Sequence, residues 1–94
     1  MIEYKNNLPI VYSNDYAVLE GADKNIKELL MNNHTRIVNE EVFRNSNLEK
    51  IKFSDILETI RDKAFMTTKL SKIEIDQKII LAFRYLLVIK IYHS

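Results

Sequence analysis

The longest apolar stretch of the chain, IDQKIILAFRYLLVIKI over Ile75–Ile91, constrains the fold most strongly. Its apolar residues recur at three- and four-residue intervals, which is the spacing of one face of an α-helix. A helix that is apolar on most of its circumference has to be buried in a core or against a partner. The stretch is shorter than a bilayer requires and contains Arg84 and Lys90, so we expect no membrane segment.

Composition points the same way. The 94 residues are enough for a single domain. With one glycine and one proline, the chain lacks the turn residues that an antiparallel β protein needs, which favours helices. We therefore predict a mainly α fold with minor β, without an internal repeat.

The order of elements along the chain follows from the local patterns. Residues 1–21 alternate apolar and polar side chains, which predicts an extended N-terminal arm or short strands. Residues 22–94 are expected to be helical, with helices near 22–33 and from Ser54 onward. The last residues, VIKIYHS, are rich in β-branched side chains and fit either the end of a helix or a short strand.

Few residues suggest chemistry. The chain has no cysteine, a single glycine cannot form a phosphate loop, and His34 and His93 are far apart in sequence without acidic neighbours of ligand spacing. We expect no catalytic residue, no cofactor and no metal, and hence no enzyme. The N-terminal residues do not resemble a secretory signal, so a cytoplasmic protein is expected.

One arrangement suggests nucleic acid. A helix, a short polar connection and a second helix across residues 54–91 have the outline of a helix-turn-helix, and its candidate DNA-facing residues are Lys69, Lys72 and Lys78. Glu74 and Asp76 would repel phosphate at the start of the second helix, and the net charge is only +1. DNA is thus a weakly supported partner, and packing of the two helices is the simpler interpretation.

The segment Phe53–Ile91 resembles the small winged-helix middle component of bacterial ABC three-component systems, which contain an SMC-like ATPase. The matching positions are Asp76, Ile79, Ala82, Leu86 and Ile91. The resemblance implies a winged-helix-like domain that acts as a non-enzymatic adaptor subunit in antiphage defence and binds a coiled-coil ATPase. It implies a partner-binding surface made by Ile80, Arg84, Leu87, Lys90 and Ile91.

Two alternatives remain open at this point. One is a small phage- or plasmid-encoded inhibitor or immunity protein that binds one host enzyme. The other is a helix-turn-helix DNA-binding regulator. In each case a macromolecular partner is expected. A homo-oligomer is also compatible with the sequence, because a chain of this length buries only a modest core.

Overall fold

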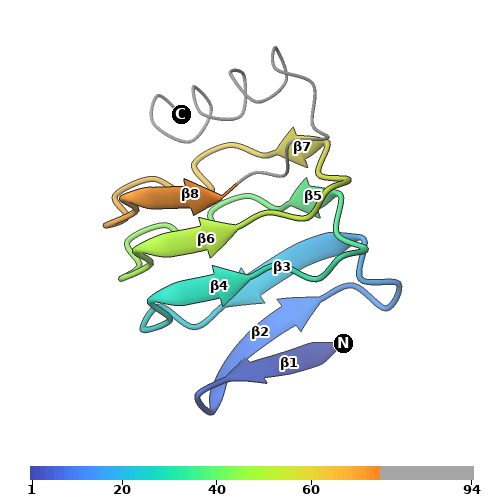
Figure 1. The fold of residues 1–94 in the computed structure, drawn as a ribbon, viewed down its shortest axis with the longest axis horizontal. Helices are drawn as coiled ribbons and strands as arrows, with labels where there is room; N and C mark the ends of the chain where they lie inside the picture. The colour runs from blue at the N-terminus through green and yellow to red at the C-terminus, as the bar shows by residue number, and fades with distance from the viewer. Residues whose placement is uncertain (75–94) are drawn as a thin grey trace.

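The structure, a computed structural model, describes residues 1–74 of the chain. These residues wind into a β-solenoid whose coils stack along one axis (Figure 1). They contain eight strands and no α-helix. The strands are β1 (Ile2–Lys5), β2 (Leu8–Tyr12), β3 (Val18–Ala22), β4 (Glu28–Leu30), β5 (Ile37–Val38), β6 (Lys50–Lys52), β7 (Thr59–Ile60) and β8 (Lys72–Glu74).

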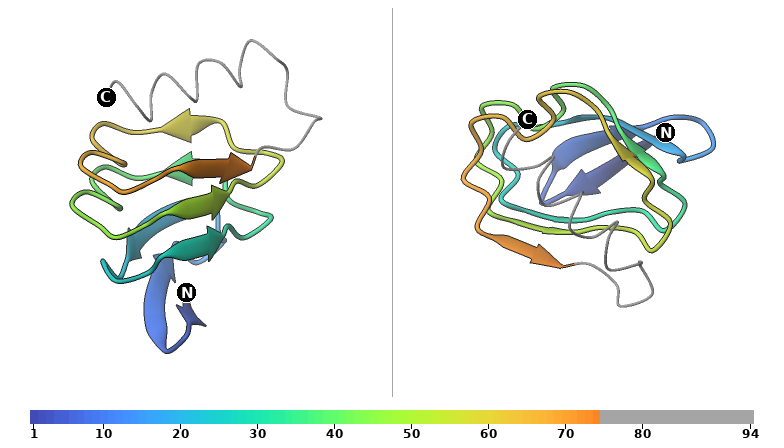
Figure 2. Two further views of the ribbon diagram at one scale, coloured as in Figure 1. Left: turned by 60° about the vertical axis from the view of Figure 1, so that its left-hand side comes forward. Right: turned by 90° about the horizontal axis from the view of Figure 1, so that it is seen from above.

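Two sheets form opposite walls of the solenoid. One sheet has the order β1-β2-β3-β5-β7, and the other has the order β4-β6-β8. From β3 onward, neighbouring strands within each sheet are parallel, because each coil contributes one strand to each wall. Seen along the stack, the coils surround a common interior (Figure 2). The fold is therefore built by repetition of a coil.

The core repeats with the coil. In the second sheet, Leu29, Ile51 and Ile73 are paired in register, and their residue numbers differ by 22 at each step. Other core positions recur at the same interval, so corresponding side chains of successive coils stack on one another. Examples of these pairs are Val38 and Ile60, Val42 and Ala64, Phe43 and Phe65, and Leu48 and Leu70.

The turns repeat as well, without glycine. Glu41 and Lys63 occupy equivalent positions and both have positive φ, at 59° and 60°. Asn45 and Thr67 form a second equivalent pair, with φ of 58° each. The backbone N–H of Asn45 donates to the carbonyl of Met66 at 3.0 Å, which joins the turns of neighbouring coils. A stacked backbone thus holds ordinary residues in the left-handed conformation.

This turn geometry leads to a prediction about stability. A β-branched residue is the least suited to positive φ, whereas asparagine tolerates it, as Asn45 does one coil earlier. We expect Thr67→Asn to raise the free energy of unfolding by about 0.5–1 kcal/mol, measured by urea denaturation. Thr67→Ala is the matched control and should gain less. A loss of stability in the asparagine variant would contradict the role of the turn.

A buried polar ladder joins three coils at a corner. Thr35 and Ser54 are both buried. The hydroxyl of Thr35 donates to the carbonyl of Tyr16 at 2.8 Å, and the hydroxyl of Ser54 donates to the carbonyl of Thr35. Because buried polar groups are costly when unpaired, these bonds fix the register of the coils at this corner.

An antiparallel hairpin covers the first coil. β1 and β2 are joined by Asn6 and Asn7, which both have positive φ, as a two-residue hairpin turn of type I′ requires. Ile10 and Tyr12 of β2 are buried and continue the core beneath the hairpin. The Tyr12 hydroxyl accepts a hydrogen bond from the backbone N–H of Asn32 at 3.2 Å, and burial raises the pKa of this phenol.

The predicted mainly α, winged-helix-like fold is wrong. Where helices were expected near 22–33 and from Ser54 onward, the described residues form turns and the strands β4, β7 and β8. The helical spacing has another origin: Phe53, Leu57, Ile60 and Ala64 all point inward because a coil turns a corner between its short strands. The scarcity of glycine wrongly favoured helices, because in this fold residues other than glycine take the positive-φ positions of the turns. The predicted helix over Ile75–Ile91 lies outside the described residues.

Candidate binding surface on β4, β6 and β8

The outward face of the three-stranded sheet carries two rows of side chains. Within each strand the middle residue points into the core, so the residues on either side of it point outward. The register aligns the outward residues across the strands. One row is Glu28, Lys50 and Lys72, and the other is Leu30, Lys52 and Glu74.

The charges on this face are only partly neutralised. Nζ of Lys50 lies 3.2 Å from Oε1 of Glu74, and Nζ of Lys72 lies 4.0 Å from the same oxygen. Within residues 1–74, neither Lys5 nor Lys52 forms an ion pair with a carboxylate. Lys5 and Lys52 can therefore attract an acidic group of a partner. The ion pairs of Lys50 and Lys72 are exposed and weak, so they do not prevent these two lysines from doing the same.

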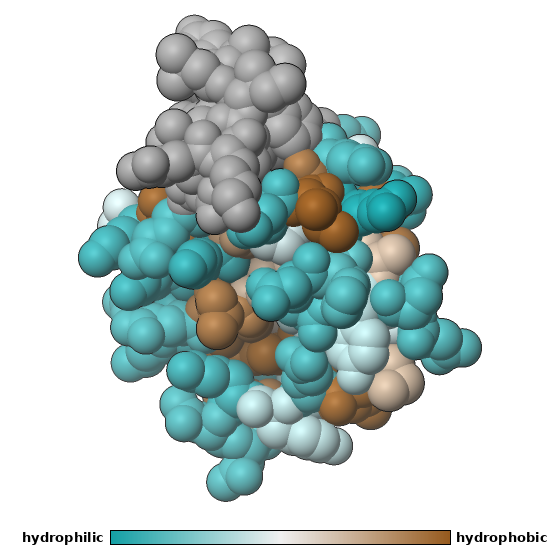
Figure 3. Space-filling view, turned by 45° about the vertical axis from the view of Figure 1, so that its right-hand side comes forward, coloured by the Kyte–Doolittle hydropathy of each residue, from teal (hydrophilic) through white to brown (hydrophobic). Residues whose placement is uncertain are grey.

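Leu30 is the exception on this charged face. Its side chain is 68% exposed at the end of β4, the outer strand of the three-stranded sheet, with Lys52 beside it in the same row. In the space-filling view, hydrophilic side chains cover most of the visible surface and apolar ones form small separate patches (Figure 3). A large apolar side chain among charges is the pattern of a contact residue with a polar rim.

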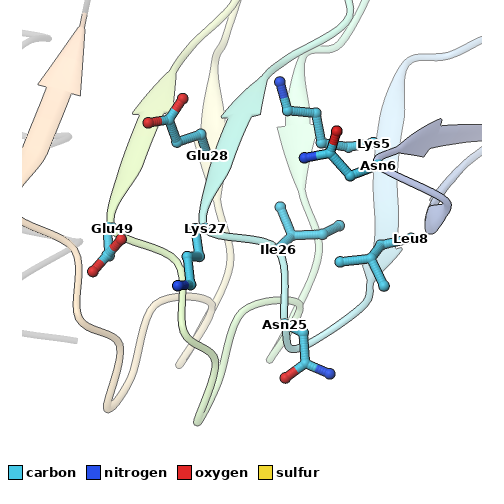
Figure 4. A pocket seen from close by; sticks show the side chains of 8 residues that line it. All are labelled: Lys5, Asn6, Leu8, Asn25, Ile26, Lys27, Glu28 and Glu49. Carbon is cyan, nitrogen blue, oxygen red and sulfur yellow. The ribbon is translucent and has the colours of Figure 1, made fainter.

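Two hollows lie along this side of the molecule, and Leu30 lines one of them. The larger, of about 330 Å³, lies where the β1–β2 turn meets the start of β4, and there Lys5 and Asn6 lie across from Lys27 and Glu28 (Figure 4). Its remaining lining residues are Leu8, Asn25, Ile26 and Glu49. The smaller, of about 150 Å³, is lined by Lys5, Glu28, Leu29, Leu30, Lys50, Lys52 and Glu74. Both are open, shallow and polar, which suits a peptide segment better than an enclosed small molecule.

The described part of the chain contains no side-chain cluster that could hold a metal ion. No group of three or more histidine and carboxylate side chains is placed to hold a metal ion in residues 1–74.

Apart from Tyr12, a clear pKa shift is found at Asp15, where hydrogen bonds from the Ser13 hydroxyl and the Ala17 N–H lower the pKa of the carboxyl group. Asp15 lies in the β2–β3 turn, and this bond network shapes the turn. Within the same residues, no helix is long and apolar enough to cross a membrane.

The structure separates the residues that the sequence singled out. Lys72 lies on the outward face of β8 beside Glu74, and Lys69 lies exposed in the turn before that strand. They are not presented on a helix, so the helix-turn-helix interpretation of this segment is wrong. Lys78, Ile80, Arg84, Leu87, Lys90 and Ile91 lie outside the described residues.

Sequence reasoning missed most of the outward face. Glu28, Leu30, Lys50 and Lys52 were not singled out, and Glu74 was considered only as a residue that would repel phosphate, although a signal for this face exists. When the chain is compared with itself at an interval of 22 residues, ELL, KIK and KIE align as three strands with an apolar centre.

The coil length and the stacked strands define this chain as a repeat protein, with one short supersecondary unit of 20–29 residues per coil as in leucine-rich repeats. The family model described as a BspA type leucine rich repeat region (6 copies) matches residues 20–87, which is more than half of the chain. The protein belongs to this family. No curated protein and no solved structure was found to match the chain.

Family membership corrects several expectations. The resemblance to a winged-helix middle component of an ABC system is wrong, and so is the expectation that no internal repeat is present. Three functional expectations are wrong for the same reason. These are the adaptor in an SMC-like ATPase complex, the DNA-binding regulator, and the inhibitor or immunity protein inferred from a short helical chain. Leucine-rich repeats generally mediate protein–protein interaction.

Proposed function

We propose that this protein is a non-enzymatic binding module whose outward face on β4, β6 and β8 holds a protein partner. The observation that carries the proposal is the position of Leu30, a highly exposed apolar side chain in register with Lys52. Apolar side chains in such a setting are typical anchors of protein interfaces. The cytoplasmic location expected from the sequence remains part of the proposal.

The chemistry of the face favours a particular kind of partner. Lys5 and Lys52 have no carboxylate partner within residues 1–74, and both border the smaller hollow beside Leu30. A partner segment with carboxylates around an apolar side chain would neutralise both lysines and cover the leucine. Complementary charge would also speed association and make it sensitive to salt.

Substitutions on the face provide the test. We expect Leu30→Asp combined with Lys52→Glu to weaken partner binding at least about tenfold, because the anchor and one attractive charge are both lost. The measurement is affinity capture from the native host with wild-type and variant baits, followed by calorimetry with the partner so identified. Both residues are exposed, so unfolding in urea should change by no more than about 1 kcal/mol.

A matched control removes the effect of charge alone. Lys63→Glu changes one charge in an exposed turn after β7, away from the three strands. This variant should capture the same partner as the wild type. If the double variant retained full affinity for every partner that the wild type binds, the outward face would not be the binding surface.

A further inference from the structure

The edge of the five-stranded sheet carries an inference that does not depend on the proposed function. Within residues 1–74, β1 has a neighbouring strand on one side only, since β2 lies next to it in the sheet order (Figure 1). Ile2 and Tyr4 are 56% and 69% exposed on this strand. An exposed edge strand with apolar side chains is a template for strand addition unless something blocks it.

The hydrogen bonds show which backbone groups of β1 are free to pair. Met1 and Tyr12 exchange both of their backbone hydrogen bonds, at 2.7 Å each. In an antiparallel ladder such hydrogen-bonded pairs alternate with non-hydrogen-bonded pairs. The backbone groups of Glu3 and Lys5 therefore bond to β2, whereas the N–H and C=O groups of Ile2 and Tyr4 point away from β2. Pro9 lies opposite Tyr4, and its carbonyl accepts from the N–H of Asp23 on the other side of β2.

The charges of β1 select one partner. When two copies of IEYK run antiparallel about a two-fold axis at Tyr4, Glu3 of each copy lies opposite Lys5 of the other. Opposite charges on directly facing residues stabilise a strand pair, whereas the register centred on Glu3 would place two carboxylates together. The strand is therefore complementary to itself in one register, as a symmetric dimer interface requires.

We propose that β1 pairs with β1 of a second copy of this chain, in the antiparallel register centred on Tyr4, so that two five-stranded sheets join into one. In this arrangement Tyr4 exchanges two backbone hydrogen bonds with its counterpart, and two Glu3–Lys5 contacts flank them. A pairing over three residues of each strand buries a small area, so the dimer dissociates on dilution.

A charge-swap series tests the register. Lys5→Glu replaces both attractive contacts by repulsive ones and should weaken self-association about tenfold or more in sedimentation equilibrium. Adding Glu3→Lys to that variant restores two opposite-charge contacts, so the double variant should recover the affinity of the wild type. A wild-type protein that is monomeric from micromolar to millimolar concentration overturns the proposal, as does a dimer that ignores Lys5→Glu.

Disulfide trapping gives an independent readout, because the chain has no cysteine of its own. In the proposed register the two Tyr4 Cα atoms lie about 5.5 Å apart, within the range that a disulfide bridges. The two Ile2 Cα atoms are offset by four residues, about 14 Å along the strand, which no disulfide spans. Tyr4→Cys should therefore cross-link under mild oxidation much faster than Ile2→Cys, and equal rates would overturn the register.

Discussion

Phe43→Ala is expected to lower the free energy of unfolding by about 3–5 kcal/mol, the usual cost of removing a buried aromatic ring. Phe43 is fully buried, and its ring stacks on that of Phe65 at a centroid distance of 5.2 Å. Phe53 in turn contacts Phe65 edge-on at 6.0 Å. The loss is a large share of the roughly 5–15 kcal/mol that stabilises a typical domain.

The effect of Phe43→Ala is measured by urea denaturation followed by far-ultraviolet circular dichroism. Phe43→Leu keeps most of the apolar volume and serves as the matched control, with an expected loss of about half as much or less. Each coil of a solenoid contacts only its neighbours, so a defect at this level also separates the coils on either side of it. A loss below about 1 kcal/mol for the alanine variant would mean that Phe43 does not join the coils.

The second large effect is expected from Ile51→Asp, which should cost about 4 kcal/mol or more and leave little folded protein. Ile51 is the central residue of β6, fully buried, and it lies between Leu29 and Ile73 in register. A carboxylate placed there has no cation to pair with among the neighbouring core side chains. It would have to be buried unpaired or remain protonated.

Lys52→Asp is the control for Ile51→Asp, one residue further along the same strand. Lys52 points outward, so the same new side chain should change the free energy of unfolding by no more than about 1 kcal/mol. The comparison tests the two-residue alternation of a strand directly. Equal losses at the two positions would contradict the inward and outward assignment of β6.

The apolar spacing of the solenoid can be recognised in the sequence at β1 and β2, but in later coils it imitates the spacing of a helix. Ile2 and Tyr4, then Leu8, Ile10 and Tyr12, alternate with the period of a strand, and β1 and β2 are found there. Beyond them each strand has only two to five residues, too few for alternation to stand out, and corners interrupt it. Ile26 and Leu29 are three residues apart on either side of a corner, which is also the spacing of a helix.

The candidate site was hidden for a different reason. Lys50, Lys52 and Glu28 are far apart in sequence or separated by an apolar residue, and only the parallel register of the coils places them in rows. A search for clusters along the chain cannot detect such rows, whereas comparison at an interval of 22 residues can. Lys72 was singled out for nucleic acid, but Glu74, two residues further along β8 and in the other row, makes the local charge mixed.

Because the coils recur at a common interval of 22 residues, the solenoid can be lengthened by inserting whole coils. Residues 37–58 contain one complete coil, with its own strand for each wall and its own left-handed turn positions. A tandem copy of this segment would meet the same neighbours on both sides as the original does. Each added unit would lengthen the outward face by one strand spacing, about 4.8 Å, so the reach of the binding surface could be adjusted by gene duplication without redesign of the core.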